Sequence, residues 1–189
     1  MSAAEWWATI FSMVYLVLAI YNKPVCFVFG IISSALWGYV VFNFNLIFDT
    51  GLQVFYVVMS IVGLYRWMYG GKEKKELPIT VDSIQNHVVY IVSGCLVSYL
   101  LFLSSNYIEI IDKPLADAVT TVFLIIGTFL LVERKLYSWI YLVAADIGYI
   151  FIYADSGLWL FVGMMAIYSV AGIWGFFAWK KEVESHVLT

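Results

Sequence analysis

Asp146 is the residue whose type and position most suggest chemistry, because it lies in the middle of a long apolar segment. A charged side chain at the centre of a bilayer costs about 2.5–3.5 kcal/mol on insertion scales. Trp139, Val143, Tyr149 and Tyr153 flank it at helical spacings, so all five side chains share one face. A carboxylate beside aromatic rings can bind a flat organic cation through charge attraction and cation–π contacts. We therefore predict a ligand contact at Asp146. The alternatives are a structural hydrogen bond for the acid and a packing or lipid-facing surface for the rings.

Other apolar segments carry polar and aromatic side chains that could complete such a site. Gln53 offers both hydrogen-bond donors and an acceptor to the polar edge of a ring, and Tyr56 follows it on the same helical stripe. The glycines nearby are expected to serve close helix packing. The predicted substrate-binding residues are Asp146, Trp139, Gln53, Tyr56, Trp37, Tyr149, Tyr168 and Ser34.

The sequence lacks the residue patterns of a catalytic or metal centre. Its two histidines, His87 and His186, lie at a loop edge and in the C-terminal tail. Its two cysteines, Cys26 and Cys95, lie in apolar runs, where they suit packing. We therefore expect no catalytic residues, no metal and no cofactor, and we predict that the protein is not an enzyme.

The elements that must position these residues are membrane helices. Hydrophobic residues make up 63% of the 189 residues and charged residues 12%, and the mean hydropathy is +0.92, which indicates lipid as the solvent. A helix needs about 20 apolar residues to cross the hydrocarbon of a bilayer. This standard predicts an all-α integral membrane protein with seven transmembrane helices. Their approximate ranges are Trp6–Tyr21, Val25–Phe42, Gly51–Tyr69, His87–Leu103, Leu115–Val132, Tyr137–Ala154 and Leu158–Trp179.

The basic residues of the loops predict the orientation of these helices. One side of the membrane would hold nine of the ten lysines and arginines, and the other side only Lys113. Cytoplasmic loops carry the excess of basic residues. We therefore predict a multi-pass protein with its N-terminus outside and its C-terminus in the cytoplasm. The nine residues are Lys23, Arg66, Lys72, Lys74, Lys75, Arg134, Lys135, Lys180 and Lys181.

An internal repeat divides the predicted helices into two groups. The pattern Tyr56, Gly63, Trp67 recurs 112 positions later as Tyr168, Gly175, Trp179. It predicts a 3+1+3 arrangement in a single transmembrane domain over residues 1–189, with repeat one at 5–70, a linking helix at 87–103 and repeat two at 115–181. The repeats would be parallel, and transporters bind their substrate between such halves.

Two runs of the sequence resemble the Pnu family of vitamin transporters. The first comprises Phe29–Ser33, Asp49 to Tyr56 and Gly63–Trp67; the second comprises Trp139–Ile140, Asp146, Gly157–Leu158, Tyr168 and Gly175 to Trp179. The resemblance spans roughly residues 22 to 181. It implies a seven-helix fold related to that of the SWEET sugar transporters. It also implies facilitated diffusion of a vitamin across the bacterial inner membrane, with a periplasmic N-terminus and a cytoplasmic C-terminus, and trapping of the vitamin by a cytoplasmic kinase through phosphorylation.

Assembly into a homotrimer is a further implication of the resemblance. The expected partners are therefore a small-molecule vitamin, the lipid membrane and functionally the kinase, with no nucleic acid. A second class of function is a substrate-binding membrane subunit that needs an energising partner.

Within the Pnu family, the nicotinamide riboside (PnuC) branch is associated with a tryptophan- and asparagine-rich signature in the sixth helix. Here Trp139 is present, Leu136 stands where another tryptophan is expected, and Asp146 is the only acid or amide. This departure favours the thiamine (PnuT-like) branch, with nicotinamide riboside as the alternative. Riboflavin and deoxynucleosides, which are neutral, gain less from an acid.

Overall fold

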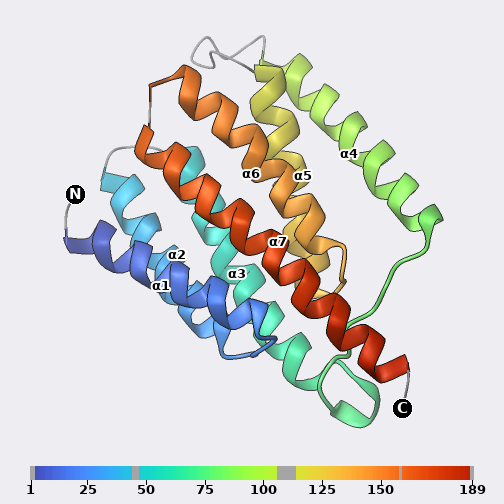
Figure 1. Cartoon of the computed structure of the whole chain (residues 1–189). Helices are drawn as coiled ribbons and strands as arrows, with labels where there is room; N and C mark the ends of the chain where they lie inside the picture. The colour runs from blue at the N-terminus through green and yellow to red at the C-terminus, as the bar shows by residue number, and fades with distance from the viewer. Residues whose placement is uncertain (1–2, 44–46, 106–113, 158, 188–189) are drawn as a thin grey trace. The chain divides into compact units, whose positions relative to one another are not determined.

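The structure is a computed structural model that describes residues 3–43, 47–105, 114–157 and 159–187. Within these residues the chain forms seven α-helices (Figure 1). A single 3₁₀ turn, η1 (Lys72–Lys74), lies between the third and fourth helices. The helices are α1 (Ala3–Ile20), α2 (Cys26–Asn43), α3 (Ile47–Tyr69), α4 (Ile84–Ser105), α5 (Pro114–Val132), α6 (Ser138–Asp155) and α7 (Trp159–Val187).

Each predicted segment corresponds to one of these helices, and the largest difference is at the end of α7. This helix continues past Trp179 to Val187, and an i,i+4 ion pair between Lys180 and Glu184, at 3.9 Å, stabilises the added turns. Leu158, the predicted start of the last segment, and Lys113, the predicted outer lysine, lie outside the described residues.

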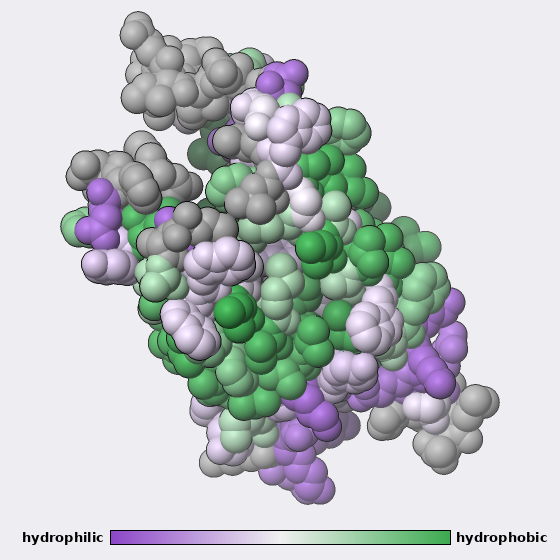
Figure 2. Space-filling view, turned by 60° about the vertical axis from the view of Figure 1, so that its left-hand side comes forward, coloured by the Kyte–Doolittle hydropathy of each residue, from purple (hydrophilic) through white to green (hydrophobic). Residues whose placement is uncertain are grey.

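Six of the seven helices are long and apolar enough to cross a membrane, so the chain is a multi-pass membrane protein. The remaining helix, α6, does not meet the same standard. Asp146 and Asp155 both lie in its 18 residues and lower its hydropathy. Figure 2 shows hydrophobic side chains over much of the visible face, with hydrophilic ones gathered towards its ends.

The described chain divides into two compact units. Unit 1 comprises Met1–Pro78 and Val132–Arg134. In it, α2 packs against both α1 and α3. The hydroxyl of Ser33 donates to the carbonyl of Ala8 at 2.9 Å, which joins α2 to α1. Phe27 meets the fully buried Trp67 edge to face, with ring centroids 4.9 Å apart, which joins α2 to α3.

Unit 2 comprises Ile79–Leu131 and Lys135–Thr189. In it, α6 packs against α7. A hydrogen bond of 3.0 Å between the hydroxyls of Thr121 and Tyr149 joins α5 to α6. A Cβ on Gly94 of α4 would lie 2.9 Å from the end of Ile126 on α5, so these helices also approach closely.

Arg134 is a buried cation of unit 1, although it follows α5 in the chain. It is 3% exposed, and its Nε donates to Oδ1 of Asn22 at 2.6 Å. Its other nitrogens donate to the carbonyls of Asn22 and Leu77, and its guanidinium lies over the ring of Trp67 at 4.9 Å. The carboxylate oxygen Oε2 of Glu76 lies 3.7 Å from Nη2 of Arg134.

The turns before α2 and α6 have the same local geometry, 112 positions apart along the chain. Asn22 and Arg134 both take a left-handed backbone, with φ of 59° and 55°. In the first turn the amide of Lys23 donates to Leu18, and in the second the amide of Lys135 donates to Leu130, each at 2.9 Å. The starts of α2 and α6 are also 112 positions apart.

The same offset relates two pairs of buried rings. Phe27 and Trp67 of unit 1 meet at an interplanar angle of 84°. Trp139 and Trp179 of unit 2 meet at 85°. In each pair a glycine, Gly63 or Gly175, gives the ring of the neighbouring helix its space.

Candidate functional site

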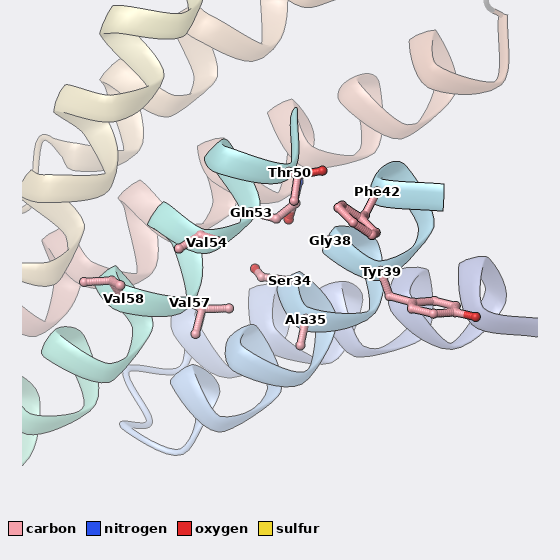
Figure 3. A pocket seen from close by; sticks show the side chains of 10 residues that line it. All are labelled: Ser34, Ala35, Gly38, Tyr39, Phe42, Thr50, Gln53, Val54, Val57 and Val58. Carbon is pink, nitrogen blue, oxygen red and sulfur yellow. The ribbon is translucent and has the colours of Figure 1, made fainter. Parts of the chain in front are cut away.

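A pocket of about 350 Å³ lies between α2 and α3 of unit 1 (Figure 3). It contains two of the predicted site residues, Ser34 and Gln53. The two helices approach closely at Gly38, where a Cβ would lie 3.3 Å from Cβ of Gln53. The other lining residues are Ala35, Tyr39, Phe42, Thr50, Val54, Val57 and Val58.

Ser34 and Gln53 supply polar atoms to this mainly apolar pocket. Figure 3 shows the hydroxyl of Ser34 pointing into the space between the helices and Tyr39 pointing away from it. Within the described part of the chain, neither Ser34 nor Gln53 has a side-chain hydrogen bond. Both are half-buried, so their donors and acceptors are available to a ligand or water.

The other predicted residues of unit 1 lie beside this pocket on the same two helices. Trp37 is one turn from Ser34 on α2, and Tyr56 is one turn from Gln53 on α3. Both rings are half-buried, and Tyr56 lies 5.5 Å from Phe55 between ring centroids. Stacking of these rings on a ligand stays a prediction.

Asp146 is buried in the middle of α6, at 8% exposure. Among the described residues its carboxylate has no hydrogen bond and no ion pair. The structural hydrogen bond that was the alternative to a ligand contact is therefore absent from this part of the chain. A buried acid without a partner is costly, which favours a charge supplied by a ligand.

Trp139 packs against α7. It is 1% exposed and meets Trp179 at 5.5 Å, and a Cβ on Gly175 would lie 2.7 Å from its ring. Its Nε1 is buried without a partner among the described residues. The ring also forms one wall of an apolar groove, so stacking of a ligand on it stays a prediction.

Tyr149 and Tyr153, predicted on the same face, stack on each other at 5.5 Å, and Tyr149 is bonded to Thr121 of α5. The aromatic residues of α6 are therefore divided between two neighbours, with Trp139 against α7 and Tyr149 against α5. Tyr168 of α7 is half-buried.

Corresponding positions of the two units carry different polar groups. Asp146 lies 112 positions after Ser34. Gly172 packs on Val143 in unit 2, and this register of the antiparallel pair places Asp146 level with Ser169.

Ser169 is a candidate that the sequence reasoning missed. It is 8% exposed, and its hydroxyl has no partner among the described residues. A polar side chain inside an apolar helix is itself a signal, and Ser169 follows the predicted Tyr168 directly. Over the described residues, His, Cys, Asp and Glu form no group of three or more that could hold a metal ion.

The ion pair of Lys135 and Asp82 lies outside the membrane-spanning helices of unit 2. Lys135 donates to Asp82 at 2.8 Å, and Tyr90 and Asn86 donate to the same carboxylate at 3.1 and 3.3 Å. Burial alone would raise the pKa of Asp82, but the hydrogen bond and charge of Lys135, with the bonds from Tyr90 and Asn86, lower that pKa below its ordinary value. Asp82 and Lys135 therefore fix the turn before α6 to the segment before α4.

The sequence matches one family model, and the fold matches a solved structure. Residues 2–181 match the model of a family described as nicotinamide mononucleotide transporters. The fold is similar to that of a solved structure described as "Crystal structure of the Vitamin B3 transporter PnuC". The TM-score is 0.77, with 20% identity over 97% of this chain and 83% of that chain. At this identity the likeness shows the fold alone. No curated protein matches the sequence.

These comparisons support the alternative branch of the family better than the preferred one. Both descriptions concern nicotinamide or vitamin B3, and neither supports thiamine, which the sequence analysis placed first. The acid and the rings could not separate the two vitamins, because both are aromatic cations.

Proposed function

Because the chain belongs to the nicotinamide mononucleotide transporter family, and so is a membrane transporter and not an enzyme, we propose that it takes up nicotinamide riboside by facilitated diffusion. The observation that carries this proposal is the buried, unpartnered Asp146 among the described residues of an apolar helix. The pyridinium ring of the riboside carries a positive charge that would pair with the negative charge of this carboxylate. The half-buried Gln53 and Ser34 offer hydrogen bonds suited to an amide or to ribose hydroxyls.

The riboside fits the chain better than the phosphorylated mononucleotide. A phosphate needs basic or backbone N–H donors. The lysines and arginines of the described residues lie in loops or near helix ends, whereas Asp146 lies in the middle of α6. A phosphate at that depth would meet a carboxylate and no cation. The trapping step would therefore follow entry, through phosphorylation by a cytoplasmic kinase.

The mechanism that we propose is a relative movement of two three-helix halves, α1–α3 and α5–α7, with α4 as the link. Support comes from the matching turns at Asn22 and Arg134 and from the matching ring pairs, both at an offset of 112. The candidate substrate contacts are Ser34 and Gln53 in the first half and Asp146 in the second. Transporters of repeated structure commonly work in this way.

Binding of nicotinamide riboside to the purified protein tests the proposal. We expect riboside to bind more tightly than the mononucleotide, thiamine or riboflavin, as measured by quenching of tryptophan fluorescence. Asp146→Asn should weaken riboside binding by about fivefold or more, because opposite unit charges about 4 Å apart attract by about 1 kcal/mol in water and by about 4 kcal/mol near a protein surface. Tighter binding of thiamine than of the riboside would show that the assignment to the nicotinamide riboside branch is wrong. If neither vitamin binds, the proposal of a vitamin transporter fails.

Asp155→Asn is the matched control for Asp146→Asn. Asp155 lies nine residues further along α6, about 13 Å away along the helix axis, at its exposed end. The same chemical change there should leave riboside affinity unaltered. Equal affinities of wild type, Asp146→Asn and Asp155→Asn would show that Asp146 does not bind the ligand.

Liposomes that contain only the purified protein test the mode of transport. Labelled riboside should enter down its gradient without a second protein. Binding without entry would instead identify the chain as a subunit that needs an energising partner.

The nine basic residues support a cytoplasmic C-terminus in the inner membrane, and a reporter fused to the C-terminus tests that orientation. The homotrimer stays a prediction.

A further inference from the structure

Asp146 and Ser169 lie at one level of the helix pair α6 and α7 in unit 2. Val143 and Asp146 are three residues apart on α6, and Ser169 and Gly172 are three apart on α7, so each pair shares a helix face. These two faces meet, because a Cβ on Gly172 would lie 2.6 Å from Cγ2 of Val143. One step from that contact along each antiparallel helix leads to Asp146 and Ser169. Both side chains are 8% exposed.

The hydroxyl of Ser169 differs from other hydroxyls in the helices of this unit. A serine or threonine inside a helix commonly bonds a carbonyl of its own helix. Ser93, Thr120 and Thr128 do so, at 2.7, 2.9 and 2.8 Å. The buried hydroxyl of Ser169 has no partner within the described ranges of the chain. An unsatisfied buried hydroxyl costs free energy, so packing alone gives no reason for a serine here.

The corresponding positions of unit 1 face a common pocket. Ser34 and Val57 stand 112 positions before Asp146 and Ser169. Both line the pocket between α2 and α3. Because the same offset relates the turns and the ring pairs described above, we expect Asp146 and Ser169 to face one site as well. Unit 2 carries a carboxylate in place of the hydroxyl of Ser34, and a hydroxyl in place of the apolar Val57.

These two side chains together favour one kind of ligand group. An ionised carboxylate only accepts hydrogen bonds, whereas a serine hydroxyl can also donate. They therefore suit a neutral group that donates from one atom and accepts at a neighbouring one. A primary carboxamide has this arrangement, because its nitrogen donates and its carbonyl oxygen accepts. A carboxylate lacks the donor, and its charge would repel that of Asp146.

We propose that Ser169 is a specificity-determining residue, whose hydroxyl donates to the carbonyl of the nicotinamide carboxamide while Asp146 accepts a hydrogen bond from the amide nitrogen. This inference rests on the proposed function. It adds to that function the residue that distinguishes the carboxamide from other substituents of the pyridinium ring. Asp146 also keeps its attraction to the ring charge, because the carboxamide is attached to the same ring.

Titration calorimetry of the purified full chain with two ligands tests the proposal. Nicotinamide riboside is compared with ribosylpyridinium, which keeps the charge and the ribose but lacks the carboxamide. The wild type should bind nicotinamide riboside about tenfold or more tightly, since a hydrogen bond to a charged group supplies at least that factor. Ser169→Ala should weaken nicotinamide riboside about 2- to 13-fold, the range for one neutral hydrogen bond, and leave ribosylpyridinium unchanged.

The possible failures of this experiment are distinguishable. If the wild type binds neither ligand, the proposed function fails, and the inference with it. If the wild type binds both ligands equally, only the carboxamide contact is overturned. Equal weakening of both ligands by Ser169→Ala would mean that the hydroxyl acts on the ribose or on packing, which also overturns the proposal. No change in either affinity would show that Ser169 does not touch the ligand.

Ser98→Ala is the matched control for Ser169→Ala. Ser98 is a serine of α4 in the same unit, 1% exposed, and its hydroxyl donates to the carbonyl of Ala118 at 3.5 Å. Loss of this hydroxyl should leave the preference for the carboxamide unaltered. Ser169→Ala should melt within about 4 °C of the wild type, because its hydroxyl has no bond to lose among the described residues. Equal loss of preference in both variants would attribute the preference to general packing of unit 2.

Nicotinic acid riboside supplies a test that needs no variant. A carboxylate replaces the carboxamide in this ligand, so the donor to Asp146 is lost and a like charge is brought near it. The wild type should bind it about fivefold or more weakly than nicotinamide riboside, the factor for two like unit charges about 4 Å apart in water. Equal affinity for the amide and the acid would overturn the proposed contacts of Ser169 and Asp146.

Discussion

Arg134 offers the sharpest test of how unit 1 is held together, because it is a cation enclosed by partners from three segments. Arg134→Gln removes the donors to the carbonyls of Asn22 and Leu77 and the contact with the ring of Trp67. A buried acceptor without a donor costs about 1–3 kcal/mol. A desolvated cation–π contact contributes about 2 kcal/mol. Glu76 adds little, because its side chain is 69% exposed.

Together, the unsatisfied acceptors and the lost cation–π contact give an expected loss of about 3–5 kcal/mol. For a chain of this size, that corresponds to a fall in melting temperature of about 6–20 °C. The assay is thermal unfolding in detergent, followed by the fluorescence of tryptophan, since Trp67 lies against the guanidinium. The melting temperature of Arg134→Lys should lie between those of the wild type and Arg134→Gln, because lysine keeps the charge but cannot form the same fork of hydrogen bonds.

Arg66 supplies the matched control in the same unit. It is bonded to Glu133, and the two side chains are 37% and 43% exposed. An exposed pair of this kind contributes at most about 1 kcal/mol. Arg66→Gln should therefore lower the melting temperature by less than about 4 °C. Equal shifts for Arg66→Gln and Arg134→Gln would refute the view that the enclosed guanidinium holds unit 1 together.

Two further predictions concern unit 2. Gly175→Ala should lower the free energy of unfolding by about 1–3 kcal/mol, because the new Cβ would lie 2.7 Å from the enclosed ring of Trp139. The control Gly163→Ala should be tolerated, because no atom lies within 4 Å of its Cβ position. Equal melting temperatures for the two variants would contradict the packing described. Asp82→Asn should lower the melting temperature at pH 7, where the carboxylate bonded to Lys135 is charged. Because the pKa of Asp82 is lowered, this stability is present above the ordinary pKa of about 3.9 and is lost as the pH falls through the folded-state pKa. The difference in melting temperature between wild type and variant should therefore shrink only at acid pH. A difference that stays constant at all pH values would argue against this role of Asp82.

The sequence was sufficient for the helices because a membrane helix is specified by local composition. The predicted start at Leu115 and the observed start at Pro114 differ by one residue, since proline suits the first turn of a helix. The extension of α7 beyond Trp179 was missed because a hydropathy criterion stops at Lys180. The helix itself continues through charged residues, of which Lys180 and Glu184 form an i,i+4 pair.

The candidate site was predicted less completely, because spacing on one helix does not reveal which neighbour each face meets. Ser34 and Gln53 were identified separately, and the structure brings them to one pocket. Trp139 and Tyr149 were placed on a common face, but one packs against α7 and the other is bonded to α5. Ser169 was missed, because a serine inside a helix often bonds its own backbone, and only the structure shows that this hydroxyl does not.

The position of Arg134 in the chain has a consequence for the order in which the protein is made. Its acceptor Leu77 is synthesised 57 residues earlier, and Asn22 earlier still. At about 5–20 residues per second, the ribosome adds Arg134 about 3–11 s after Leu77. Throughout that interval the first three helices have been synthesised, but the cation that completes their unit has not. The N-terminal half therefore finishes folding only when the second half is already under construction.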